Sequence, residues 1–362
     1  MRPTVHDIAA TAGVSLATVD RVLNGRPGVR TVTRQKVEEA IGALGFTRDM
    51  AAVNLAKGRV YPFVFIVPQG NNSFMTNLKR EIRDAATRLR VERTSIRLVE
   101  VPPFDVDALV AAITHVQGDK LAGIRPAGVA LVAIDAPAVR AGIADMKAAG
   151  IPVVTLVSDV PGAGHDHYAG IDNLAAGRTA GSLMGRFLDG REGSVLVLAG
   201  SMLVRDHAER LQGFAQSMAR ISPTNPVLPV LEGQDDPDLS EKLVREALGK
   251  HGDCIGLYSL GAGNRGMIRA LEQRGLENRG GALRVIAHEL TPHSRAALAA
   301  GMIDAVLNQD AGHEVRSAIR VLKAKADGQS VITAQERIRI DIFLNDNLPP
   351  EMEEENIHVS RS

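Results

Sequence analysis

Short apolar runs alternate with helix-like stretches over most of this chain, and the alternation limits the folds that it can form. From residue 60 onward the apolar runs are YPFVFIVPQ, IRLVEV, GVALVAI, IPVVTLVS, GSVLVLAG, LPVLEG, CIGLYSL and LRVIAHE. Each run precedes a segment with apolar residues at helical spacing, a pattern that indicates βαβ units and a parallel sheet. About ten such units exceed one ordinary sheet, so we expect two doubly wound parallel-sheet lobes with a cleft at the carboxyl ends of their strands.

Charge is unevenly distributed along the sequence. The 362 residues carry 42 basic and 42 acidic side chains, but residues 1–59 hold nine Lys or Arg against five Asp or Glu. A basic end joined to a more acidic body indicates a polyanion-binding segment. The single cysteine, Cys254, suits a reducing compartment, and we find no signal peptide and no apolar run near the roughly 18 residues that span a bilayer. We therefore expect a cytoplasmic protein.

The first 46 residues predict three short helices. Residues 5–12 have apolar side chains at helical spacing, and Gly13 then allows a tight turn. Ser15 is a good N-cap for a second helix that ends at Asn24-Gly25, and a third helix is expected over about residues 33–44. The expected core positions are Val5, Ile8, Ala9, Ala12, Val19, Val22, Leu23, Val37, Ile41 and Leu44. Two helices joined by a three- or four-residue turn, with a third beside them, form a helix-turn-helix domain.

The outward face of the second helix would consist of Leu16, Ala17, Asp20 and Arg21. Arg21 can donate two parallel hydrogen bonds to guanine, a contact that contributes roughly 1–3 kcal/mol of discrimination. Leu16 and Ala17 offer apolar contact, for instance to a thymine methyl group. Asp20 could accept from cytosine or orient Arg21, although it also repels phosphate. The alternative interpretation is a small helical cap with Arg21 in solvent.

These motifs resemble the DNA-binding headpiece of the LacI/GalR family of bacterial transcription regulators. The matching string is Val5, Asp7-Ile8-Ala9, Ala12-Gly13-Val14-Ser15, Thr18-Val19, Arg21-Val22-Leu23-Asn24-Gly25, Thr33-Arg34 and Leu44-Gly45-Phe46. The resemblance implies that Leu16, Ala17 and Arg21 read bases, while Ser15, Thr18 and Asn24 contact or support the phosphate backbone. Asp20 stands where the family usually has Ser.

Residues 47–59 read TRDMAAVNLAKGR, with Asp49 as a plausible N-cap and Gly58 as a stop. The helix would have about seven residues, and isolated helices below roughly 12–15 residues are marginal in water. The resemblance implies a hinge helix that orders in the DNA minor groove, with Leu55 wedged between base steps and Ala52 against the partner helix. Arg48 and Asp49 depart from the family's Pro and Asn, and a plain linker is the alternative. The full predicted DNA-binding set is Thr4, Ser15, Leu16, Ala17, Thr18, Asp20, Arg21, Asn24, Arg34, Ala52 and Leu55.

The body from residue 60 resembles a type I periplasmic sugar-binding protein, which implies two Rossmann-like lobes joined by three crossings. The crossings are expected near residues 161–168, 289–292 and 323–332. The predicted domains are residues 1–46 for the helix-turn-helix, 47–59 for the hinge helix and linker, 60–345 for the effector-binding domain and 346–362 for a tail. Lobe one would hold residues 60–161 and 292–322, and lobe two residues 168–289 and 323–345.

The resemblance also implies a ligand site at the strand ends of the body. The matching residues are Asn72, Phe74, Asp135, Ser158, Asp159, Asp172, Arg210, Ser259, Glu289 and Gln309. Carboxylates, amides and Arg supply the donors and acceptors that buried hydroxyl groups need. Some of these side chains could instead cap the helix that follows. Glu289 replaces the usual Asp and Phe74 is the one clear aromatic platform, so a sugar, a polyol, a pentose and a sugar phosphate all remain open.

One motif favours an alternative function. Residues 261–266 spell GAGNRG between a predicted strand and helix, and Glu289 follows at a suitable distance for a ribose contact. This pattern is typical of an NAD-dependent dehydrogenase. However, about six strands precede it, whereas a nucleotide-binding fold normally opens with this unit.

No other motif in the sequence indicates catalysis. The histidines lack the spacing of a helical zinc site, and no G-x-S-x-G is present, so we expect neither an enzyme nor a metal or other cofactor. An exported solute-binding protein would share the body but would have no use for the headpiece. The sequence therefore predicts a homodimeric transcriptional regulator in the cytoplasm, associated with the nucleoid. We expect a repressor of double-stranded operator DNA, controlled by a small sugar-like effector.

Overall fold

The computed structural model describes residues 3–46, 58–70, 72–118, 125–261, 263–275 and 283–350. The chain divides into two units, Met1–Arg59 and Val60–Ser362. Across the described residues, no helix is both long and apolar enough to cross a bilayer.

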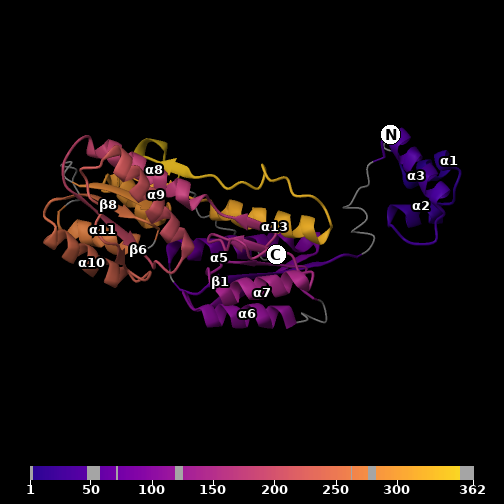
Figure 1. Ribbon diagram of the computed structural model, residues 1–362, viewed down its shortest axis with the longest axis horizontal. Helices are drawn as coiled ribbons and strands as arrows, with labels where there is room; N and C mark the ends of the chain where they lie inside the picture. The colour runs from indigo at the N-terminus through magenta and orange to yellow at the C-terminus, as the bar shows by residue number, and fades with distance from the viewer. Residues whose placement is uncertain are drawn as a thin grey trace, which may run out of the picture. The chain divides into compact units, whose positions relative to one another are not determined.

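The first unit is the predicted three-helix domain (Figure 1). Its helices are α1 (Val5–Ala12), α2 (Leu16–Leu23) and α3 (Thr31–Leu44). A capping box begins α1, in which the Thr4 hydroxyl accepts from the Asp7 N–H and the Asp7 carboxylate accepts from the Thr4 N–H at 2.7 Å. The backbone hydrogen bond from Thr4 lowers the pKa of Asp7. Gly13 ends α1 in the left-handed conformation, and Ser15 caps α2, so the turn between them is fixed at both ends.

The core of this unit follows the helical spacing, with one exception. Its buried residues are Ile8, Ala9, Val19, Val22, Val37 and Ala40. Val5 was expected inside but is 40% exposed, and it is the first residue of α1. The third helix begins at Thr31 rather than near residue 33.

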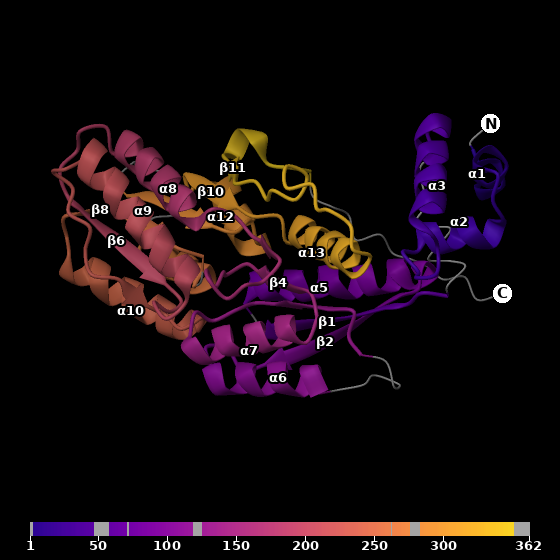
Figure 2. The same cartoon turned by 45° about the vertical axis from the view of Figure 1, so that its right-hand side comes forward.

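Lobe one of the second unit contains a parallel five-stranded sheet in the order β2-β1-β3-β4-β5. The strands are β1 (Tyr61–Pro68), β2 (Thr94–Val101), β3 (Gly128–Leu131), β4 (Val153–Leu156) and β5 (His167–Ala169). Helices α5 (Ser73–Arg88) and α13 (Ala311–Ala326) cover one face, and α6 (Val106–Gly118) and α7 (Pro137–Ala148) cover the other (Figure 2). A short 3₁₀ turn, η1 (Leu89–Glu92), follows α5. Alternate residues of β1 reach the two cores, with Phe65 on the α5 side and Ile66 on the α6 side.

Lobe two contains a six-stranded sheet in the order β11-β10-β9-β8-β6-β7, in which only β11 runs antiparallel to its neighbour among the described strands. The strands are β6 (Ser194–Ala199), β7 (Leu231–Glu232), β8 (Cys254–Ser259), β9 (Arg284–His288), β10 (Ala305–Asn308) and β11 (Asp341–Phe343). Helices α8 (Asn173–Leu188) and α9 (Arg205–Ile221) pack on one face. The other face carries α10 (Pro237–Lys250), α11 (Asn264–Gln273) and α12 (Pro292–Ala300), and η2 (Asn345–Asn347) follows β11.

The crossings between the lobes differ from the predicted positions. The first follows β5, because residues 167–169 still pair with β4 in lobe one. The predicted crossing at residues 289–292 is wrong, since β10 pairs with β9 at Leu307 and His288, and α12 is the helix that connects these two strands. The chain returns to lobe one only between β10 and α13, so residues 292–308 belong to lobe two. The third crossing lies between α13 and β11.

Candidate functional site

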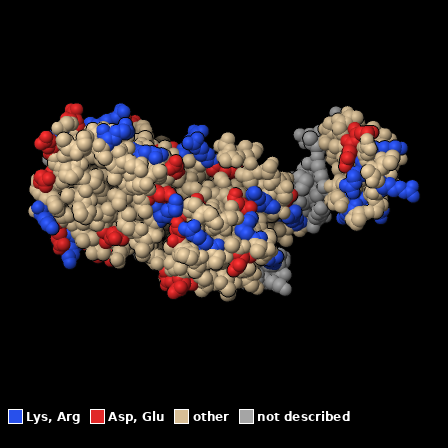
Figure 3. All heavy atoms as spheres, in the orientation of Figure 1, with Lys and Arg blue, Asp and Glu red and all other residues tan. Residues whose placement is uncertain are grey.

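The outward face of α2 is the first candidate site. Val19 and Val22 of this helix are buried, while Leu16, Ala17, Asp20 and Arg21 are exposed. The apolar spacing therefore orients the helix as a recognition helix requires. On the body, by contrast, Figure 3 shows acidic and basic side chains interspersed over the visible face.

Asp20 has partners other than Arg21. One of its carboxylate oxygens accepts from the Asn24 side-chain amide at 2.7 Å, and the other accepts from Arg26 Nη1 at 3.1 Å. Asn24 also donates to the backbone carbonyl of Asp20 at 2.8 Å. Asp20 thus ties the end of α2 to the turn that follows, and within the described residues no bond joins it to Arg21.

The other predicted DNA contacts lie around the same helices. Thr4 and Ser15 are exposed caps, and the Ser15 hydroxyl lies 3.0 Å from that of Thr18. Arg34 is half-buried near the start of α3. Ala52 and Leu55 lie outside the described residues.

The second candidate site is a cavity between the two lobes of the body. Its volume is about 830 Å³, including the part that opens to solvent, which is within the range of small-molecule sites. Six of the ten predicted effector residues line it, namely Asn72, Phe74, Ser158, Arg210, Glu289 and Gln309. The strand-end positions thus do converge on one cleft.

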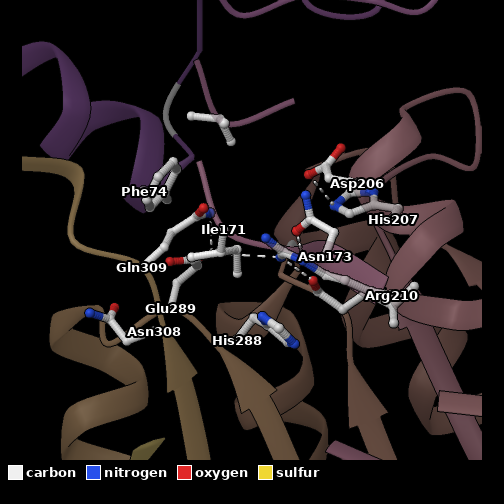
Figure 4. A network of polar contacts seen from close by, with 12 residues as sticks. Phe74, Ile171, Asn173, Asp206, His207, Arg210, His288, Glu289, Asn308 and Gln309 are labelled. Atoms are coloured by element: carbon white, nitrogen blue, oxygen red, sulfur yellow. Dashed lines mark hydrogen bonds and ion pairs between the residues drawn. The ribbon is translucent and has the colours of Figure 1, made fainter. Parts of the chain in front are cut away.

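Arg210 is the buried cation of this cleft (Figure 4). Its side chain is 1% exposed, its Nε donates to Asn173 Oδ1 at 2.8 Å, and its Nη1 donates to the Leu260 carbonyl at 2.6 Å. Glu289 Oε1 lies 3.6 Å from the same Nη1. The remaining nitrogen, Nη2, has no hydrogen-bond partner among the described residues. The cavity therefore contains a guanidinium that is held in place and whose Nη2 can still donate to a ligand.

Glycines hold Arg210 in this place. A Cβ on Gly177 of α8 would lie 2.0 Å from the Arg210 carbonyl oxygen, and one on Gly213 of α9 would lie 2.1 Å from a carbonyl of α8. Only glycine allows two helix backbones to approach so closely. Gly261 has a φ of +141° and lies beside Arg210. A Cβ on Gly261 would be 2.7 Å from Arg210 Nη1. The spacing Gly177-x-x-x-Gly181-x-x-x-Gly185 is the sequence signal for this contact.

Glu289 is the acidic partner in the cleft. Gln309 Nε2 donates to its Oε1 at 2.8 Å, while its Oε2 has no partner among the described residues. Burial raises the pKa of Glu289 to about 7, and the positive charge of Arg210 opposes this shift. Nearby Glu314 is fully buried with neither carboxylate oxygen hydrogen-bonded within the described chain, and burial raises its pKa well above the usual value.

Backbone strain gathers at the same cavity. Seven described non-glycine residues have positive φ, and four of them line the cavity, namely Phe104, Val157, Asp235 and Glu289. Such conformations cost on the order of 1–3 kcal/mol each and cluster at ligand sites. The strain is independent support for a functional cavity here.

Three predicted effector residues have local structural roles instead. Asp159 accepts from the Thr155 hydroxyl at 2.9 Å, and Asp172 caps α8 by accepting from a first-turn N–H at 2.8 Å. Ser259 donates to Asn264 at 2.6 Å and is fully buried. None of the three lines the cavity. For Asp172, helix capping is the alternative that the sequence had left open.

Asp135, the fourth predicted effector residue outside the cavity wall, takes part in a contact that joins the lobes. Asp135 of lobe one accepts from Arg205 of lobe two at 3.1 Å and also pairs with Arg140. Another inter-lobe bond runs from the Asn72 side-chain amide to Asp235 Oδ2 at 3.1 Å. These contacts connect the lobes beside the cavity.

Sequence reasoning missed five polar or aromatic residues of the cavity: Gln69, Phe104, Asp206, His207 and Asp235. Gln69 and Phe104 follow strand ends, so the rule that selected the other residues could have found them. Asp206 and His207 lie in the first turn of α9, and Asp235 follows a strand of only two residues, which carries little signal. Phe104 also corrects the expectation that Phe74 is the one aromatic platform.

The GAGNRG segment has a packing explanation. Besides the contact of Gly261 with Arg210, a Cβ on Gly263 would lie 2.6 Å from Ser240 Oγ, and one on Gly266 would lie 2.1 Å from a carbonyl of α10. The protein's own atoms therefore occupy the space that glycines would leave for a pyrophosphate. Searched over the described residues, no group of His, Cys, Asp or Glu could hold a metal ion.

Comparison with known proteins identifies both units. Residues 4–49 match the model of the bacterial regulatory proteins, lacI family, and residues 63–330 match a periplasmic binding protein domain. Catabolite control protein A of Priestia megaterium is 42% identical over 87 residues, which are 24% of this chain and 26% of that protein. The match thus spans about a quarter of the length of this curated relative.

Solved structures resemble the body in fold. An ABC transporter solute-binding protein from Burkholderia graminis C4D1M, in complex with D-arabinose, superposes with a TM-score of 0.72 at 21% identity, covering 81% of this chain and 99% of that one. A LacI-type transcriptional regulator assigned in Bacteroides fragilis gives 0.68 at 18% identity, covering 80% and 98%. At such identities the likeness shows the fold alone.

Proposed function

Because the chain belongs to the periplasmic binding protein domain family and carries an amino-terminal domain of the lacI family of bacterial regulatory proteins, we propose that it is a sequence-specific DNA-binding transcriptional regulator. A small sugar-like effector bound between the lobes controls it. The main support is that one chain combines two features. The face of α2 that includes Arg21 is exposed, and the Arg21 side chain has no partner among the described residues. The cavity of the body holds buried polar atoms without hydrogen-bond partners.

The regulator acts as a homodimer that represses transcription. One short recognition helix covers only a few base pairs, and two-fold symmetric half-sites supply the rest of the operator. The predicted hinge helix and linker, residues 47–59 with Ala52 and Leu55, include residues 47–57, which lie outside the described part of the chain. Effector binding changes operator affinity by the difference between its affinities for the two conformations, and by no more.

Several features support a sugar-like effector. The cavity has the volume of a small-molecule site, and its polar groups combine a guanidinium, carboxylates and an amide. The neighbour bound to D-arabinose has the same fold. We propose no enzymatic activity, since the glycines of the one dehydrogenase-like motif are explained by packing.

Operator selection from random duplex DNA tests the proposal. Wild-type protein should enrich a two-fold symmetric sequence. Arg21→Ala should relax base preference at one position per half-site by about ten- to hundredfold, because a bidentate Arg–guanine contact contributes about 1–3 kcal/mol. Arg34→Ala should instead weaken all duplexes alike and reduce the salt slope by about one. An unchanged base preference in Arg21→Ala would contradict the groove assignment.

A further inference from the structure

The two walls of the cavity differ in chemistry. Lobe one contributes mainly apolar side chains, among them Phe74, Val101, Phe104, Val132 and Ile134. Lobe two and the adjoining crossing contribute Asp206, His207, Arg210, Asp235, Glu289 and Gln309. A ligand that fills the cavity therefore meets an apolar surface on one side and hydrogen-bonding groups on the other.

Unpaired acceptors outnumber unpaired donors on the polar wall. Glu289 Oε2, Asp235 Oδ1 and Gln309 Oε1 are buried and have no hydrogen-bond partner within the described chain. The unpaired charged donor is Arg210 Nη2. Gln309 cannot reverse its amide, because its nitrogen already donates to Glu289 at 2.8 Å. Buried polar atoms need partners, so a ligand that completes this wall must bring at least three donors and one or two acceptors.

Charge on the same wall opposes an anion. Three carboxyl groups, those of Asp206, Asp235 and Glu289, line the cavity together with one guanidinium and the imidazole of His207. Arg210 is already engaged by Asn173, by a backbone carbonyl and by Glu289. A phosphate or carboxylate would therefore lie beside three acidic groups, with the two N–H groups of Arg210 Nη2 to receive it.

We propose, on the basis of the proposed function, that the effector is an uncharged polyhydroxy compound with one apolar face, and that the site excludes sugar phosphates and sugar acids. Hydroxyl groups donate to Glu289, Asp235 and Gln309, and one of them accepts from Arg210. The apolar C–H face lies against the lobe-one wall. Neutral cyclic sugars, deoxy sugars and cyclitols have this chemistry.

The test uses the full chain and two sets of probes. The first set is a bacterial small-molecule extract divided by ion exchange into anionic, cationic and neutral fractions. The second set pairs neutral aldoses and cyclitols with their monophosphates and uronic acids at equal concentration. We expect the neutral fraction and neutral compounds to raise the melting temperature, since a ligand at a hundred times its Kd stabilises by about 2.7 kcal/mol.

Substitutions in the polar wall test whether its residues cause the shift in melting temperature. Glu289→Gln and Asp235→Asn replace an acceptor oxygen by an amide nitrogen of similar size, so each should reduce the affinity for the neutral ligand at least tenfold. Asp145→Asn, a substitution on α7 outside the cavity lining, should leave it unchanged. Loss of binding in all three variants would overturn the assignment of the wall.

Other outcomes separate the two proposals. A shift produced only by the anionic or the cationic fraction, or by no fraction, would overturn the ligand class. Operator selection with the same preparation then shows whether the regulator function survives. If no duplex is preferred, the proposed function fails even where a neutral sugar binds.

Discussion

Glu289 is a carboxyl group in an unusual setting. It is buried with a positive φ of 69°, and burial raises its pKa to about 7 against the effect of Arg210. Gln309 donates to it, and the charge of Asp206 also raises its pKa. The charge of Glu289 in turn raises the pKa of Glu314. Its ionisation therefore changes in the pH range where a regulator works.

The affinity for a neutral effector should depend on pH through this group. Hydroxyl donors favour the carboxylate form, so binding lowers the pKa of Glu289 and releases a proton. Affinity should then rise with pH up to and through 7, by up to about tenfold for one pKa unit. Calorimetry on both sides of pH 7 in two buffers measures the released proton. The dependence should vanish in Glu289→Gln, and an affinity that falls with pH would indicate an anionic ligand.

Asp20 offers a second test on a single residue. Its carboxylate holds Asn24 and Arg26 at the end of α2, and its negative charge lies on the exposed face of that helix. Asp20→Ser should raise the affinity for all duplexes and steepen the salt slope by about one, because Arg26 becomes available to phosphate. Base preference should not change.

Salt titrations of duplex binding measure both quantities for Asp20→Ser. Glu39→Ser, which also removes an exposed acid from the first unit, is the control and should have the smaller effect. Equal effects of the two substitutions would indicate that only net charge matters.

Among the elements, those with a local signal were predicted well. The first unit was predicted almost completely, because caps such as Ser15 and the spacing of Val19 and Val22 depend on neighbours in sequence. The long buried strands were predicted for the same reason. By contrast, β10 was not among the predicted apolar runs, and its pairing with β9 and β11, far away in the sequence, defines it. The error at β10 moved one crossing and placed α12 in the wrong lobe.

The candidate site shows the same division between local and distant information. The family resemblance predicted Phe74, Arg210 and Glu289 as ligand contacts, and all three line the cavity. Whether a polar residue after a strand faces the cleft or caps a helix, as Asp172 does, depends on the packing of elements far apart in sequence.

The contact between α8 and α9 provides a prediction at this scale. Gly177→Ala places a Cβ 2.0 Å from a backbone carbonyl of α9, so the helices must separate. We expect a loss of about 1–3 kcal/mol in the free energy of unfolding and weaker effector binding, since Arg210 moves with α9. Urea unfolding measures the first effect and calorimetry the second.

The matched control is Gly249→Ala in α10, where a Cβ would meet only Arg274 at an ordinary 3.6 Å. That substitution should stabilise by about 0.5–1 kcal/mol, because alanine favours a helix over glycine. Stabilisation by both substitutions would show that the α8–α9 contact tolerates a side chain.

At the scale of the whole body, the described bonds that join the lobes include those from Asn72 to Asp235 and from Arg205 to Asp135. Such bonds favour the conformation in which the lobes are in contact, so they contribute to any balance between conformations. The effector need only add to contacts that the protein already makes.

Asp135→Asn should shift the balance toward separated lobes. The pair with Arg205 is partly exposed, so its loss is expected to change effector affinity by about two- to fivefold, corresponding to roughly 0.5–1 kcal/mol. Small-angle scattering of the effector-free protein should give a larger radius of gyration. Asp159→Asn, whose described partners lie within lobe one, is the control. Equal scattering curves for Asp135→Asn and the wild type would contradict this role.

The glycine-mediated helix contact also determines where this sensor can be redesigned. The close contact between the backbones of α8 and α9 fixes the position of Arg210, so a substitution there would disturb lobe two. Val101 and Phe104, by contrast, line the cavity from the end of β2 and the loop after it. Mutant libraries that seek a response to new effectors should therefore diversify that loop and leave the guanidinium alone.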